Sequence, residues 1–148
     1  MKTSYTFSPA LFSAVAATVL FSSCIFETVS DRFYQTEWYS EEVPLGPFDV
    51  STLTLEFLCD GVVTINTTGI KLQADSVQTV DIPDNHSLTG KYHPDDDSAV
   101  LEGLSATFGT HTITFIEANR NGDIVFLLWR IEDSVYPFTT ALRKVNRK

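Results

Sequence analysis

From residue 34 onward, apolar and polar residues alternate with a period of two, and turn-forming residues recur about every ten positions. A period of two, rather than 3.6, is typical of β-strands, because successive side chains of a strand point to opposite faces. The alternation therefore predicts antiparallel β-structure. The predicted strands are 37–41, 52–58, 62–67, 87–92, 99–104, 112–117, 124–131 and 138–145, and 77–82 is either a ninth strand or a loop.

The register of the first clear hairpin can be predicted from which side chains share a face. Leu55 and Phe57 share one face of a strand, and Val63 and Ile65 share one face of the next. A two-residue loop would place these two apolar sets on opposite sides of the sheet. A three-residue loop ending at Gly61 pairs Phe57 with Val63 and Leu55 with Ile65. We predict the three-residue loop, with a positive φ at Gly61.

Two polar segments are predicted to be hairpin tips. Five turn-forming residues occupy 119–123, and three consecutive aspartates end the segment 93–97. The first lacks the downstream glutamate of an EF-hand calcium loop, so the turn interpretation is favoured. The strand that follows, 124–131, is apolar on both faces. Either another segment covers its outer face, or it is an exposed patch for a partner.

Eight nearly consecutive antiparallel strands can close into a small up-and-down barrel, and closure removes the edges of the sheet. The chain has 148 residues, which suits a single domain once a leader is removed. We therefore expect an all-β fold, an antiparallel barrel of about eight strands at 34–148. With eight strands, the interior is either filled by side chains or holds one small ligand.

The N-terminal segment is predicted to be a signal peptide, 1–23. Its apolar run, 10–21, is too short to span a membrane, which takes about 20 residues, but it has the length of a signal-peptide core. Small residues then precede Cys24. The segment 24–33 is expected to be a short tether.

Phe21, Ser22, Ser23 and Cys24 resemble the lipobox of bacterial lipoproteins, with phenylalanine where leucine is commoner. The resemblance implies diacylglycerol on the Cys24 sulfur and usually a third acyl chain on its new amino group. Two or more acyl chains hold a protein firmly to a membrane. We expect anchorage in the outer membrane facing the periplasm, with surface exposure as the alternative.

The C-terminal segment 138–144, together with Gly90-Lys91-Tyr92 and the early Trp38, resembles lipocalin-like domains of small bacterial lipoproteins. This resemblance implies a lipocalin-like barrel. Thr36-Glu37-Trp38 stands where true lipocalins have Gly-x-Trp.

The chain has two cysteines, and a pair in an exported protein suggests a disulfide. A thioether-linked lipid on Cys24 excludes that bond. We then expect Cys59 to be a small buried side chain rather than a nucleophile.

The formal net charge is −9, from 10 basic and 19 acidic residues. Such a field repels phosphate backbones and anionic lipid headgroups. We therefore expect no nucleic-acid partner, and membrane attachment through the anchor alone.

Residues with catalytic or metal-binding chemistry are few. The three histidines, His86, His93 and His111, lie at predicted loops or strand starts, and no serine occupies a Gly-x-Ser-x-Gly elbow. His86 and His93 have no nearby thiolate, so a zinc site is not indicated. We expect no enzyme activity, no metal and no cofactor.

Ser76, Ser98 and Ser134 each follow an aspartate and precede an apolar residue. These motifs resemble acceptors of a periplasmic O-glycosylation system in some anaerobic Gram-negative bacteria. Ordinary loop sequence is the more economical interpretation at any one of these serines.

Two functions are compatible with these features. The first is a tethered, non-enzymatic module that binds a small apolar ligand, or docks a protein through 126–129. Its ligand-binding candidates are Leu55, Phe57, Tyr92, Phe115, Trp129 and Arg130. The alternative is a periplasmic inhibitor of a protease or lysozyme-type enzyme, whose marks would be a filled core and a rigid loop at 94–97.

Overall fold

The structure is a computed structural model that describes residues 31–73, 82–132 and 134–146. Its strands form one antiparallel sheet. They are β1 (Glu37–Leu45), β2 (Phe48–Phe57), β3 (Val62–Thr68), β4 (Lys71–Leu72), β5 (Asn85–Asp95), β6 (Ser98–Glu102), β7 (Ser105–Phe108), β8 (His111–Asn121), β9 (Ile124–Ile131) and β10 (Phe138–Lys144), with a 3-10 turn η2 (Cys59–Gly61).

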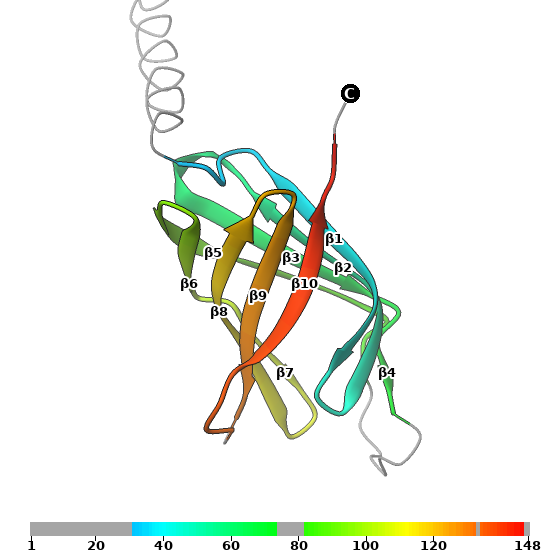
Figure 1. Cartoon of the computed structure of the whole chain (residues 1–148). Helices are drawn as coiled ribbons and strands as arrows, with labels where there is room; N and C mark the ends of the chain where they lie inside the picture. The colour runs from blue at the N-terminus through cyan, green and yellow to red at the C-terminus, as the bar shows by residue number, and fades with distance from the viewer. Residues whose placement is uncertain (1–30, 74–81, 133, 147–148) are drawn as a thin grey trace, which may run out of the picture.

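The sheet closes into a barrel because β1 pairs with β2 on one side and with β10 on the other (Figure 1). Eight strands form the closed wall, in the order β1, β2, β3, β5, β6, β8, β9 and β10. This confirms the predicted all-β up-and-down barrel. Two short strands were not predicted: β4 pairs with β2, and β7 pairs with β8. Of the segment 77–82, only Ile82 is described, and it lies outside the strands.

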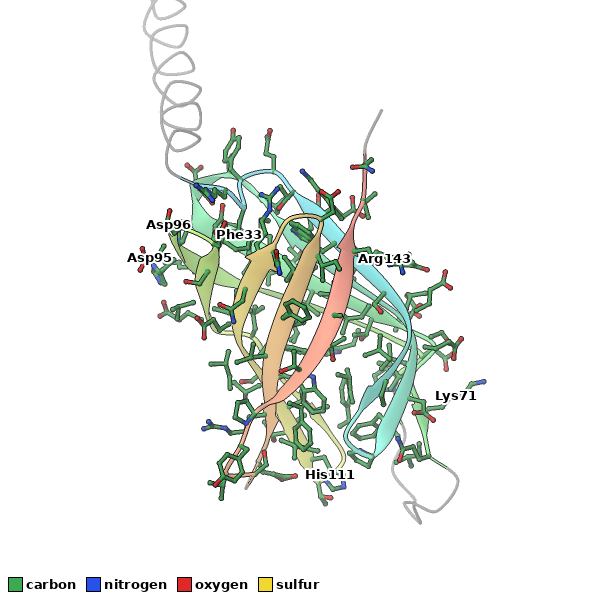
Figure 2. The ribbon with its side chains drawn as sticks, in the orientation of Figure 1. Phe33, Lys71, Asp95, Asp96, His111 and Arg143 are labelled. Atoms are coloured by element: carbon green, nitrogen blue, oxygen red, sulfur yellow. The ribbon has the colours of Figure 1, made fainter. Side chains whose placement is uncertain are left out.

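The two ends of the barrel differ. We name one end of the barrel the near end. Residue 31 joins the barrel there, and the same end holds the turns η2, 96–97 and 122–123. At the far end lie the turns 46–47 and 109–110 and, between β9 and β10, residues 132 and 134–137, which we name the far-end loop. Figure 2 shows Phe33 at the near end and His111 at the far end.

The hairpin between β2 and β3 has the predicted register. Phe57 pairs with Val63, and Leu55 pairs with Ile65. Gly61 has φ +72°, as the three-residue loop requires. The parity argument is confirmed because both apolar sets face the interior, where these four side chains are at most 1% exposed.

The hairpin between β8 and β9 is tighter than predicted. The five-residue turn at 119–123 is wrong, because β8 continues to Asn121, which pairs with Ile124. Only Gly122 and Asp123 turn the chain, and Gly122 has φ +65°. A glycine that adopts positive φ allows a two-residue turn, so polar residues before it stay in the strand.

Candidate functional site

The interior of the barrel is filled by side chains. The cavity at its far end measures about 10 Å³ and is apolar, with Phe48, Leu88, Phe108 and Phe115 among its lining residues. A water molecule occupies about that much probe volume, whereas small-molecule sites measure hundreds of Å³. The described barrel therefore has no interior space for an organic ligand in this conformation.

The near end is closed by Phe33, whose side chain is fully buried. Its ring lies 4.8 Å from the ring of Phe57, which lies 4.8 Å from the ring of Tyr92. Thr36 fixes the segment from the other side: its hydroxyl donates to the Phe33 carbonyl at 2.6 Å and accepts from Trp38 Nε1 at 2.9 Å. Asp31 to Phe33, which the sequence assigned to the tether, thus pack as a plug.

Asp31 ties the plug to the barrel wall. Its Oδ1 accepts from the backbone N–H groups of Phe33 at 2.8 Å and Tyr34 at 3.1 Å. Its Oδ2 accepts from the Tyr92 hydroxyl, which also donates to the Leu58 carbonyl at 3.2 Å. The bonds of Oδ1 order the turn before β1, and the bond of Oδ2 joins that segment to β5.

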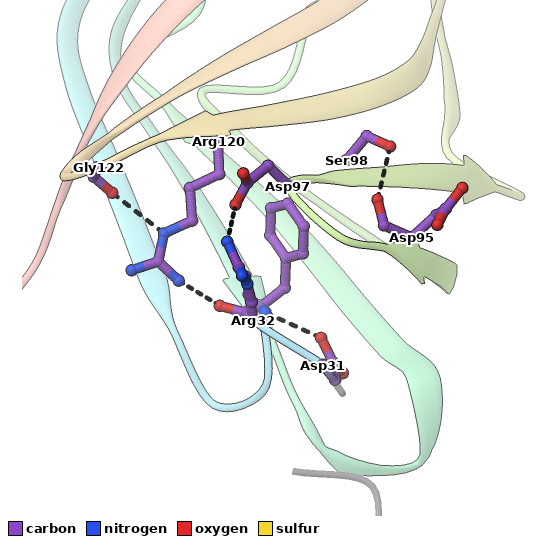
Figure 3. A network of polar contacts seen from close by, with 8 residues as sticks. Asp31, Arg32, Asp95, Asp97, Ser98, Arg120 and Gly122 are labelled. Atoms are coloured by element: carbon purple, nitrogen blue, oxygen red, sulfur yellow. Dashed lines mark hydrogen bonds and ion pairs between the residues drawn. The ribbon is translucent and has the colours of Figure 1, made fainter. Parts of the chain in front are cut away.

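Two arginines connect the plug to neighbouring hairpin tips (Figure 3). Arg32 Nη1 lies 2.9 Å from Asp97 Oδ1, and this hydrogen bond raises the pKa of Arg32. Arg120 donates to the Arg32 carbonyl and, through Nε, to the Gly122 carbonyl at 3.1 Å. The Arg32–Asp97 pair is exposed, so it orders the turn more than it stabilises the fold.

Apolar side chains gather on the outer face of β9. Val125, Leu127 and Trp129 point into the barrel, so Ile124, Phe126 and Leu128 point outward. Ile124 is 40% exposed and Phe126 is 38% exposed.

Neighbouring strands leave this outer face uncovered. Phe126 pairs with Asn119 on one side and Ala141 on the other, and neither is large enough to cover its ring. We name Ile124, Phe126 and Leu128 the β9 strip. No described segment of this chain covers the β9 strip, which agrees with the second alternative raised by the sequence, an exposed patch.

A second group of exposed apolar side chains lies in the far-end loop and at the start of β10. This group was not predicted from the sequence. Val135 is 78% exposed and Tyr136 is 80% exposed. Phe138 stacks on Trp129 with ring centroids 4.7 Å apart, and Trp129 Nε1 donates to the Thr140 hydroxyl at 3.0 Å. The signal was present in the apolar residues around Pro137, which a turn would normally not carry.

The six ligand-binding candidates are not gathered around one cavity. Leu55, Phe57 and Tyr92 are buried toward the near end, where Phe33 fills the space beside Phe57. Phe115 lines the small cavity and pairs in register with Trp129. The sixth, Arg130, is exposed on the outside of β9.

The modification candidates fall in three places. Ser98 donates to the Asp95 carbonyl at 3.1 Å, and Ser134 donates to the Ile131 carbonyl at 2.8 Å. Both hydroxyls are therefore engaged in turn geometry. Ser76 and Cys24 lie outside the described residues.

Cys59, in the η2 turn, is half-buried and disulfide-bonded, so the expectation of a buried cysteine outside any disulfide is wrong. The only other cysteine in the sequence is Cys24. In the described part of the chain, no helix has the length and apolarity to cross a membrane.

The histidines occupy separate sites. His93 Nε2 lies 2.9 Å from Glu102, whose pKa is lowered by that hydrogen bond, and His111 Nδ1 lies 3.0 Å from Glu132. His86 packs edge-on against Phe108. Among residues 31–73, 82–132 and 134–146, no three metal-ligating side chains group together.

Comparison with known proteins adds no relative: no protein-family model, no curated protein and no solved structure matches this chain. The candidate site is therefore defined by geometry, as the β9 strip on the outside of a filled barrel.

Proposed function

We propose that this chain is a non-enzymatic protein-interaction module, held at a bacterial membrane by a lipid on Cys24, that docks a partner through the β9 strip. The observation that supports it is the contrast between inside and outside. The interior cavity is about 10 Å³, while Phe126 and Ile124 are more than a third exposed. A filled barrel with apolar side chains outside favours a protein partner over a small ligand.

The surroundings of the β9 strip support an interface. Exposed arginines flank it: Arg130 lies on β9 itself and Arg143 pairs with Ile124. Aromatic and arginine side chains are enriched at protein interfaces, with apolar groups at the centre and polar groups at the rim. The partner that fits is a folded protein with an apolar patch and carboxylates at its edge.

Site-specific photocrosslinking tests the docking surface. With p-benzoylphenylalanine in place of Phe126, we expect one discrete protein adduct in the native host. The same probe in place of Thr64, an outward residue of β3, should give none. Equal adducts from both positions, or none from position 126, would contradict the proposal.

Phe126→Ser is expected to weaken the identified complex about tenfold or more, as truncation of a central aromatic residue does. The free energy of unfolding should change by less than about 1 kcal/mol because the side chain is partly exposed. Titration calorimetry measures the affinity, and denaturant unfolding the stability. Thr64→Ser serves as the matched control on the opposite wall. An unchanged affinity would remove the β9 strip from the interface.

The lipid anchor is tested at Cys24. Cys24→Ser should move the protein from the membrane fraction to the soluble fraction, because a domain without acyl chains loses its attachment. The disulfide at Cys59 opposes this part of the proposal, since one sulfur cannot hold both a thioether and a disulfide. Intact mass without reductant decides: added diacylglycerol supports the anchor, and a Cys24–Cys59 bond rejects it.

A second candidate, an inhibitor that presents the turn 96–97, is favoured by one observation. The turn is held in place, since Arg120 N–H donates to the Asp97 carbonyl at 2.6 Å and Arg32 pairs with the Asp97 carboxylate. Asp96 in the turn and Asp95 before it are both exposed, as Figure 2 shows. Inhibition of a cationic lysozyme that is lost in Asp95→Lys/Asp96→Lys, but kept in Phe126→Ser, would favour this function.

A further inference from the structure

The wall of the barrel opens between β5 and β7. Residues 91–95 of β5 pair with β6, whereas residues 85–90 of β5 pair only with β3. After Gly103 the chain continues as β7, which pairs with β8 and not with β5. Two strand edges without a paired strand among the described residues therefore face the same opening.

Hairpin geometry identifies the backbone groups at the β7 edge. Phe108 pairs with His111 across a two-residue turn, so this pair exchanges hydrogen bonds, and the bonded pairs alternate along the ladder. The bond from Phe115 N–H to the Leu104 carbonyl, at 2.9 Å, agrees with this alternation. Ser105 and Thr107 therefore point their N–H and C=O groups away from β8, toward the opening.

The β5 edge follows by the same reasoning. Asp95 pairs with Ser98 across a two-residue turn, so odd-numbered residues of β5 direct their backbone groups to the β6 side. Beyond the end of the β6 pairing, these residues are Asn85, Ser87 and Thr89. Each edge thus offers backbone N–H and C=O groups at every second residue, the repeat with which a neighbouring strand pairs.

The side chains at the opening suit an uncharged strand. The outward residues are serine, threonine and asparagine, and neither edge carries lysine, proline or any charged residue, the usual protection of an exposed edge. The inward residues include Leu88 and Ala106, and both line the apolar cavity of about 10 Å³. The inner side of the opening is therefore apolar and has little free volume, so the inward side chains of an added strand should be apolar and small.

We propose that this opening binds an extended peptide segment of a partner protein by strand addition. The peptide pairs its backbone with Ser105 and Thr107, and places small apolar residues inward and hydroxyl residues outward. Unpaired backbone edges recognise an extended chain through its main-chain groups, and the pockets behind them select alternate side chains. The opening is independent of the β9 strip, which lies on other strands.

A labelled peptide, Lys-Val-Thr-Val-Thr-Val-Lys, provides the probe. We expect saturable binding by fluorescence anisotropy at concentrations below about 1 mM. A peptide with N-methyl groups on its valine amides keeps the side chains and loses donors, so it should bind about tenfold more weakly or worse. Equal binding of the two peptides, or no saturable binding, would overturn the proposal. Neither result needs a protein variant.

A matched pair of variants tests the β7 edge. Thr107→Pro removes an N–H that points toward the opening and leaves the β7–β8 hydrogen bonds in place, so it should weaken binding about tenfold. Thr107→Val keeps the N–H and should bind within about twofold of the original. Loss of binding in both variants would overturn the main-chain mechanism.

Amide hydrogen exchange by NMR reports the edge directly. The N–H groups of Ser87, Thr89, Ser105 and Thr107 should exchange fast in the free protein and become protected when the peptide binds. Protection of these amides before the peptide is added would overturn the proposal, because the edges would then be occupied already. Phe126→Ser should leave this binding unchanged, which separates it from docking at the β9 strip.

Discussion

Replacing Phe33 by alanine is expected to lower the free energy of unfolding by about 3 to 5 kcal/mol. The side chain is fully buried against Phe57 at the near end, so its removal leaves a cavity that the closed wall cannot fill by collapse. The Arg32–Asp97 ion pair is exposed and cannot compensate, because exposed pairs contribute little. Denaturant unfolding with a fixed m value measures the change.

Tyr136→Ala is the matched control for Phe33→Ala. Tyr136 is also an aromatic residue outside the strands, but it is 80% exposed, so its loss should change stability by less than about 0.5 kcal/mol. A loss of unfolding free energy below about 1 kcal/mol for Phe33→Ala would contradict the packing of Phe33 as a plug, because truncating a buried phenylalanine costs more than that. The plug also fixes the place where the N-terminal segment meets the barrel, at Asp31 on the near end.

Side-chain parity was enough to predict most of the barrel. Each predicted strand between 37 and 145 overlaps an observed one, and the register of Phe57 with Val63 follows from which residues must face inward. These features are local, since a strand buried on one face has to alternate. The β9 strip was visible for the same reason, because its outward positions break the alternation with apolar residues.

The plug and the filled interior were not predictable in this way. Phe33 lies outside the strands and belongs to no strand ladder, so no periodicity marks it. Whether eight strands enclose a ligand or only side chains depends on how rings from distant strands meet. Phe48, Phe108 and His86 come from three strands, and their edge-on contacts occupy the space at the far end. Such volume is a property of the assembled barrel.

The break between β6 and β7 leaves a weak signal in the sequence. Leu101 and Leu104 both face the interior although they are three positions apart, which violates the period of two. Gly103 lies between them with φ +79°, a conformation that resets the parity of the strand. The sequence shows the anomaly, but its cause lies on the neighbouring strand, where Gly90 has no side chain and leaves the space that Leu104 occupies.

Gly90→Ala is expected to destabilise the fold by about 1 to 3 kcal/mol, because it overpacks the point where β5 and β6 separate. An added Cβ at residue 90 would lie 2.3 Å from the Glu102 carbonyl oxygen and 3.0 Å from Leu104 Cδ2. The carbonyl belongs to the backbone, so the strand itself must shift. Leu104 turns inward over Gly90 and fills the space that a side chain would otherwise take.

Gly122→Asn is the matched control for Gly90→Ala. An added Cβ at residue 122 meets nothing within 4 Å, and asparagine tolerates the positive φ of that turn, so the cost should stay below about 1 kcal/mol. Thermal unfolding should therefore show a clear loss for Gly90→Ala and little for Gly122→Asn. Equal stability of Gly90→Ala and the original would mean that β6 and Leu104 lie farther from β5 than the structure places them. The place where β5 separates from β6, which bounds the opening between β5 and β7, would then not be fixed by contact between Gly90 and Leu104.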